Sequence, residues 1–261
     1  MPSPSLVPGD GVERRTWMPA YAITFQAITS LFLGLRLVSR LTKQSTKWGW
    51  DDVFIILAFA FGGGLTALVL LSTYTAGFDR HIWDVPWTEW ARGGLFGRLI
   101  EVLFIPASCF NKVSVLLFYQ RVVEGTCSRY YKVSVWVALI FCVLYSIVFE
   151  FLLFTICRPV EAIWMRYDPT YTANYHCVSP FTETWTTQLA GALSVFSDFY
   201  ALLLPGFLLM QLNIPMRQKV GLYCIFGLGF SVVAAGIVRT IYLGRVFSGK
   251  STDITCKCNH F

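Results

Sequence analysis

Six long apolar segments alternate with polar connections along the chain. Each is close to the roughly 20 residues that a helix needs to cross a bilayer. They cover about residues 18–38, 53–74, 99–119, 133–156, 186–212 and 220–243. The pattern predicts an all-α fold, a polytopic transmembrane helix bundle with six spans, between a polar tail over 1–17 and a short tail over 244–261.

The composition excludes an ordinary soluble domain. Of the 261 residues, 55% are hydrophobic and only 14% are charged, whereas soluble domains carry roughly 25% charged residues. Residues 1–17 contain no apolar core of a cleavable signal peptide, so the first apolar helix is expected to serve as an uncleaved anchor.

Basic residues predict the orientation of the bundle. The connections 38–51, 121–132 and 213–219 hold eight Lys or Arg residues in 33 positions. The alternate connections, 74–97 and 157–184, hold four in 52. Since cytosolic connections are rich in Lys and Arg, the N-terminus is expected outside, although Arg14 and Arg15 oppose this orientation. A multi-pass protein of the plasma membrane is the expected location.

Ionisable side chains inside the spans are the main candidates for function, because burying them in a membrane is costly. Each lies beside small or polar residues at helical steps of three or four, as Ser194 does beside Asp198, which indicates a face turned toward other helices. The candidate core consists of Glu101, Asn111, Lys112, Glu150, Asp198 and Arg239.

Depth along the helices predicts partners for these charges. Lys112 and Asp198 each lie roughly 18–20 Å from the outer ends of their helices, so they are expected to pair near mid-membrane. Glu101, Glu150 and Arg239 lie within roughly 3–9 Å of the outer ends and form a candidate outer cluster. Two interpretations stay open: structural ion pairs that fix the helix register, or a ligand or proton pathway.

Two adjacent carboxylates, Asp51 and Asp52, precede the second apolar segment. They could form a metal or acid/base pair, but further ligands are not visible in the sequence. Acidic residues are favoured at helix N-termini by unpaired N–H groups and the helix dipole. We interpret the pair as a cytosolic helix cap, with Lys43 and Lys47 close enough to offset its charge.

The cysteines separate into three groups. Cys157 and Cys177 share one connection on the predicted outer, oxidising side, which favours a disulfide. Cysteines inside the spans are expected to act as small apolar residues. The tail residues Cys256, Cys258 and His260 lack a fourth ligand nearby, so no metal site is predicted.

Several stretches together resemble the fungal rhodopsin-domain integral membrane proteins. They include GWDD (49–52), GFDRHIWDV (77–85), NKVSVLLFYQR (111–121), CRPVEAIWMRYD (157–168) and the long match over 197–230. That family includes seven-helix receptor-like proteins and proteins encoded beside secondary-metabolite enzymes. The resemblance implies a seven-helix-type architecture, and CKCNHF follows where the family continues to a seventh helix. A truncated or altered product is therefore expected, with a genuine six-helix protein as the alternative.

The resemblance implies a receptor-like protein that senses a small ligand and signals to a cytosolic partner. Arg121 occupies the position of the arginine that ends helix 3 in G-protein-coupled receptors, although Gln120 replaces the acidic neighbour typical there. Retinal is not expected, because rhodopsins carry the Schiff-base lysine on the seventh helix and Lys112 is the only lysine in a predicted span. No other cofactor and no nucleic-acid partner are expected.

Two other classes remain open on the residues. A membrane enzyme could use Glu101, Glu150 or Asp198 as a general acid toward an isoprenoid substrate, which requires a carboxyl group that no cation neutralises. This requirement counts against Asp198 more than against Glu150. A transporter is the third class, but no broken-helix pair or inverted repeat is visible.

Overall fold

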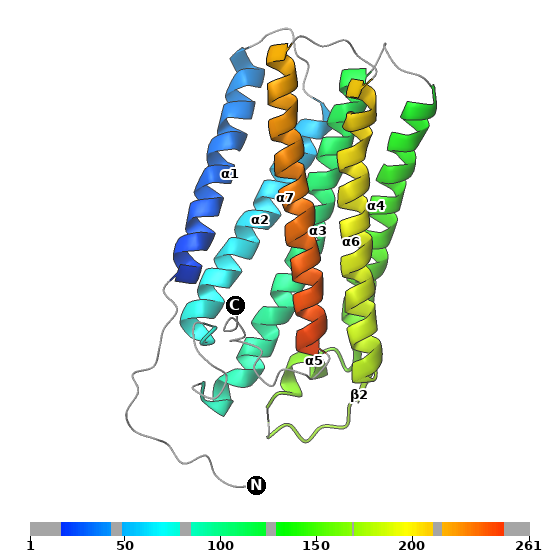
Figure 1. The fold of residues 1–261 in the computed structure, drawn as a ribbon. Helices are drawn as coiled ribbons and strands as arrows, with labels where there is room; N and C mark the ends of the chain where they lie inside the picture. The colour runs from blue at the N-terminus through cyan, green and yellow to red at the C-terminus, as the bar shows by residue number, and fades with distance from the viewer. Residues whose placement is uncertain are drawn as a thin grey trace.

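The computed structural model describes residues 17–42, 49–78, 85–123, 129–168, 170–210 and 216–247. Its six long helices run in alternate directions (Figure 1): α1 (Trp17–Thr42), α2 (Trp50–Thr75), α3 (Trp90–Val123), α4 (Arg129–Thr155), α6 (Pro180–Met210) and α7 (Met216–Phe247). Short elements lie between them: the 3-10 turn η2 (Trp87–Glu89), the strands β1 (Cys157–Arg158) and β2 (His176–Cys177), and the helix α5 (Ala162–Met165).

The all-α transmembrane bundle is confirmed. In the described residues, five helices are long and apolar enough to cross a membrane, and α7 contributes a shorter apolar stretch, Phe226–Tyr242. Each of the six predicted segments coincides with one long helix. The largest difference is at α3, which begins at Trp90 rather than at residue 99.

The early start of α3 has a packing reason. Its first turns lie against the connection that contains α5, and Gly94 allows a close approach there. A Cβ atom at Gly94 would lie 2.7 Å from the ring carbon Cδ2 of Tyr167. Gly94 therefore serves a close packing contact, and α3 continues through it.

Helix α3 lies at the centre of the bundle. It contacts α2, α4, α5 and α6, whereas α1 packs on α2 and α7 packs on α6. We call the end of the bundle with α5, β1 and β2 the disulfide end, and the opposite end the Asp51 end. In Figure 1 the disulfide end is at the bottom, and α3 and α6 both start there.

The contact between α6 and α7 depends on small residues, as the sequence pattern indicates. A Cβ atom at Gly191 would lie 2.6 Å from Thr240 Oγ1, so only a glycine fits without displacement of α7. Thr240 Oγ1 also donates a hydrogen bond to the carbonyl oxygen of Gly236, at 2.9 Å. Large apolar side chains on the outside of the bundle are exposed, as Phe32 and Leu228 are. Such a surface suits contact with lipid chains.

Candidate functional site

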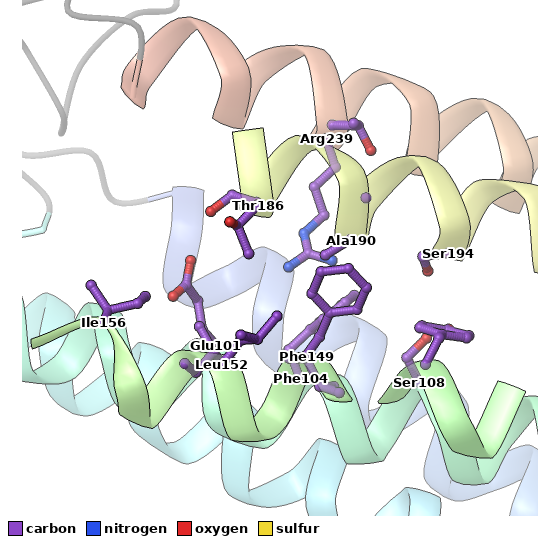
Figure 2. A pocket seen from close by; sticks show the side chains of 16 residues that line it. Glu101, Phe104, Ser108, Phe149, Leu152, Ile156, Thr186, Ala190, Ser194 and Arg239 are labelled. Carbon is purple, nitrogen blue, oxygen red and sulfur yellow. The ribbon is translucent and has the colours of Figure 1, made fainter. Parts of the chain in front are cut away.

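A cavity lies between α3, α4, α6 and α7. It is closer to the disulfide end of the bundle than Lys112 and Asp198 are. Its volume is about 90 Å³. Polar and apolar side chains share its wall. Figure 2 shows Glu101, Phe104, Ser108, Phe149, Leu152, Ile156, Thr186, Ala190, Ser194 and Arg239 around this space.

Arg239 extends from α7 across the cavity toward α3. Its guanidinium carbon lies 3.4 Å from the centroid of the Phe104 ring, which is a cation–π contact. Figure 2 shows the guanidinium between this ring and the carboxylate of Glu101. Glu101 and Arg239, two members of the predicted outer cluster, thus line the same cavity, but no ion pair joins them among the described residues.

Glu101 is instead paired within its own helix. Arg98 Nη1 donates to Glu101 Oε2 at 2.9 Å, and Arg98 Nη2 lies 3.4 Å from Glu183 Oε1. Arg166, just after α5, donates to the same Glu183 oxygen at 3.1 Å. Since Glu183 is buried at the start of α6, this chain of charges ties α3, α6 and the connection between α4 and α6 together.

Sequence reasoning missed Arg98, Arg166 and Glu183 because they lie at or beyond the predicted span ends. A signal for one contact was present: Arg98 precedes Glu101 by three residues, a spacing that brings two side chains together on a helix surface. The contacts of Glu183 join residues 17 and 85 positions apart, and no local spacing indicates them.

Lys112 and Asp198 form the predicted contact, with Lys112 Nζ 3.1 Å from Asp198 Oδ1. The ammonium group also donates to Ser197 Oγ at 2.8 Å, Ser194 Oγ at 2.9 Å and Tyr145 Oη at 3.1 Å. The side chain of Lys112 is only 7% exposed. An ammonium with this many acceptors is fully satisfied, so the pair joins α3, α4 and α6 in one polar contact.

The connection between α4 and α6 is fixed by the Cys157–Cys177 disulfide, which confirms the sequence prediction. The two cysteines also face each other in the antiparallel pair β1–β2. Between them, Ala162 and Ile163 of α5 are buried with Ile156. Because α5 contacts α3, the connection is held against the bundle next to the cavity that Ile156 helps to line.

Two predicted core residues lie elsewhere, and the outer cluster is corrected accordingly. Glu150 lines a separate, almost wholly apolar groove of about 890 Å³ between α2, α3 and α4. Its Oε2 is buried and has no hydrogen-bond partner among the described residues. Asn111 is exposed and lines neither the cavity nor this groove. Steps of three and four identify a shared helix face, but they do not say which neighbouring helix that face meets.

At the Asp51 end, Asp51 and Asp52 do more than cap α2. The cap is present, because Asp52 Oδ2 accepts the backbone N–H of Gly49 at 3.3 Å. Both carboxylates are also buried, and Arg36 of α1 donates to Asp51 at 2.8 Å and to Asp52 at 3.1 Å.

Two further arginines complete this cluster. Arg40 of α1 lies 3.1 Å from Asp51 Oδ2, and Arg121 at the end of α3 lies 3.3 Å from Asp51 Oδ1. The cluster of Arg36, Arg40, Asp51, Asp52 and Arg121 therefore joins α1, α2 and α3. The predicted neighbours Lys43 and Lys47 lie outside the described residues.

The part of the chain described by the structure contains no group of three or more His, Cys, Asp or Glu side chains that could hold a metal ion. The tail residues Cys256, Cys258 and His260 lie outside it.

Three fungal proteins are similar to this chain. It is 26% identical over 214 residues to a SAT4 family membrane protein of Emericella nidulans, covering 80% of this chain and 51% of that protein. It is 27% identical over 247 residues to Receptor GIN3 of Arthrobotrys oligospora, covering 90% of this chain and 55% of that protein. Phomoidride biosynthesis cluster protein H of a fungal species is 27% identical over 192 residues, covering 60% of this chain and 63% of that protein.

The chain thus spans between about half and two thirds of the length of these relatives. No solved structure matches it. The model of the fungal rhodopsin domain matches residues 35–260, which is most of the sequence. The chain therefore belongs to the fungal rhodopsin domain family.

Proposed function

We propose that this protein is receptor-like and senses a small ligand in the cavity between α3, α4, α6 and α7. The observation that carries the proposal is the cavity itself, which places a cation, hydroxyl groups and apolar side chains around one partly open space. Ligand sites combine these features: mostly apolar walls with a few polar groups that fix orientation. With the N-terminus outside at the plasma membrane, the disulfide end faces the exterior.

The relatives are consistent with this proposal. One of them is named as a receptor, and it is similar to 90% of this chain. Another is named for a biosynthesis cluster, which suits an accessory role in secondary metabolism. The receptor role is favoured here because the cavity lies beside a connection that a disulfide and an ion-pair network hold in place.

A signal would leave through the Asp51 end. Helix α3 carries Glu101 and Phe104 at the cavity, Lys112 at mid-length and Arg121 in the cluster with Asp51. A shift of α3 on ligand binding would therefore act directly on the contact between Arg121 and Asp51. We propose that a cytosolic partner recognises this end, where basic side chains are concentrated.

A matched pair of neighbouring variants tests the cavity as the ligand site. Ala190 lines the cavity, whereas Leu189 is exposed on the outside of the same helix. A panel of small molecules would be screened for an increase in Tm of the purified chain in lipid nanodiscs. Ala190→Phe should abolish the increase for a true ligand, and Leu189→Phe should preserve it. Hits that stabilise both variants equally would contradict the proposal.

We propose no retinal for this protein. The ammonium of Lys112 already donates to Asp198, Ser194 and Ser197, so Schiff-base formation would forfeit these contacts. Adding all-trans retinal to the purified chain tests this proposal. A visible absorbance band, or a retinyl adduct at Lys112 found by mass spectrometry after borohydride reduction, would be the contrary result.

A membrane enzyme is the second candidate, and Glu150 is the observation in its favour. Its carboxyl group lies in an apolar groove, with a buried oxygen that lacks a hydrogen-bond partner among the described residues. A general acid in a membrane would need such an environment. Turnover of a prenyl substrate by membranes that contain the protein, lost in Glu150→Gln, would favour this function over the receptor.

A further inference from the structure

We infer that the cavity recognises a carboxylate, either a small organic acid or the head group of a fatty acid, and that Arg239 binds it. This inference rests on the proposed function and gives the chemical class of the ligand. It depends on the charge balance around the cavity, on the unused donors of Arg239 and on the size of the space.

The charges in and beside the disulfide end of the cavity do not cancel. Glu101 and Arg239 line the cavity, and Arg98, Arg166 and Glu183 belong to the ion-pair network that starts at Glu101. Arg98 contacts both carboxylates, and Arg166 contacts Glu183. One positive charge is therefore in excess, and an anionic ligand would balance it.

The excess charge is located on Arg239. Its guanidinium carbon lies 3.4 Å from the centroid of the Phe104 ring, a distance that suits stacking, and Arg239 forms no hydrogen bond with the other residues that the structure describes. The N–H groups of a guanidinium point outward in its plane, so stacking leaves these donors available. A carboxylate can accept two of them in parallel, which is the strongest arrangement for this pair of groups.

Glu101 does not prevent the approach of an anion. Its Oε2 accepts a hydrogen bond from Arg98 at 2.9 Å, so an opposite charge already compensates the carboxylate. Figure 2 shows Glu101 and Arg239 on opposite sides of the space, with Thr186 above it. A bound carboxylate would lie between Arg239 and this side of the cavity.

The size and the remaining wall define the rest of the ligand. The cavity holds about 90 Å³, equal to the share of about three water molecules at roughly 30 Å³ each. This volume suits a carboxylate with a few methylene groups. The apolar wall for those methylene groups consists of Phe149, Leu152 and Ile156. A second charged group on the ligand would not suit this wall.

Three probes of similar size and different charge test the inference: butanoate, butanamide and butylamine. The full chain in nanodiscs of uncharged phosphatidylcholine would be titrated with each, with Tm as the readout. Because hydrogen bonds to a charged group are stronger than neutral ones, butanoate should bind roughly 10- to 100-fold more tightly than butanamide. Butylamine should not bind.

Variants assign the effect to Arg239. Arg239→Gln should remove the preference for butanoate, and Arg239→Lys should retain a weaker preference, because a lysine keeps the charge without the planar donors. Arg92→Gln is the matched control, since Arg92 is exposed at the same end and pairs with Glu89. If Arg239→Gln fails to fold, the probe comparison on the wild-type chain still decides.

Equal binding of butanoate and butanamide, stronger binding of butylamine, or stabilisation by neither butanoate nor hexadecanoate would overturn the inference. A neutral ligand that stabilises the wild type but not Ala190→Phe would leave the receptor proposal intact while this inference fails. The source of the acid is decided by a second comparison. Stabilisation by butanoate from solution indicates a soluble acid, and stabilisation only by hexadecanoate within the nanodisc indicates a fatty acid.

Discussion

Removal of the Lys112 ammonium should leave the carboxylate of Asp198 without its ion-pair partner in the middle of the bundle. In Lys112→Met, Asp198 loses its only ion-pair partner among the described residues, and its side chain is 19% exposed. Breaking a buried pair costs about 3–5 kcal/mol. The partial exposure of Asp198 places the expected loss at about 3 kcal/mol, or roughly 100-fold in the folding equilibrium.

The hydroxyl group of Ser197 adds little to this loss. Ser197 Oγ still donates to the carbonyl oxygen of Ser194 at 2.8 Å, so it remains satisfied without the ammonium. The double variant Lys112→Met/Asp198→Leu should recover at least about 1 kcal/mol, since contacting residues are coupled by about 0.5–3 kcal/mol.

Thermal or denaturant unfolding of the purified chain in nanodiscs measures both variants. Lys132→Met is the matched control, because Lys132 is exposed near the start of α4 and should change stability by less than about 0.5 kcal/mol. A stability of Lys112→Met within that margin of the wild type, or a double variant no more stable than the single one, would refute the reasoning.

Two further variants and one chemical reduction test other contacts, each by unfolding of the purified chain. Asp52→Asn should cost about 1–3 kcal/mol, because it removes the charge from two contacts while Arg36 and Arg40 keep their contacts with Asp51; exposed Glu161→Gln should cost almost nothing. Reducing the Cys157–Cys177 disulfide should cost about 3 kcal/mol, the loop-closure value for a separation of 20 residues; unchanged stability of the fully reduced chain would argue against this role. Gly191→Ala should cost about 1–3 kcal/mol, because its Cβ would meet Thr240 at 2.6 Å. By contrast, Gly97→Ala has nothing within 4 Å of its Cβ and should be neutral or stabilising.

The sequence could predict contacts that depend on depth in the membrane. Lys112 and Asp198 lie at similar distances from the same end of the bundle, and a charge that deep has few partners to choose from. Cys157 and Cys177 lie in one connection on one side, so their pairing was also predictable. In both cases the position of each residue along the membrane normal was sufficient to predict the contact.

Contacts that depend on rotation about the helix axis could not be predicted. Glu150 and Glu101 lie near the same end, yet Glu150 faces the groove between α2, α3 and α4, and Glu101 faces the cavity. Arg36 is an intermediate case. An antiparallel pair of helices brings Arg36 of α1 opposite Asp51 of α2, and the lengths of the two segments could have indicated that contact.

The close packing of α6 on α7 has a mechanical consequence. Because Gly191 and Thr240 are in close contact, α6 and α7 should move as one rigid body relative to the rest of the bundle. Helix α6 has 31 residues, a length of about 45 Å at 1.5 Å per residue. A tilt of about 5° around one end would move the other end by about 4 Å over that length. An anion that draws Arg239 toward α3 would thus tilt α6 and α7 together from the disulfide end. The displacement would be largest at the opposite membrane face.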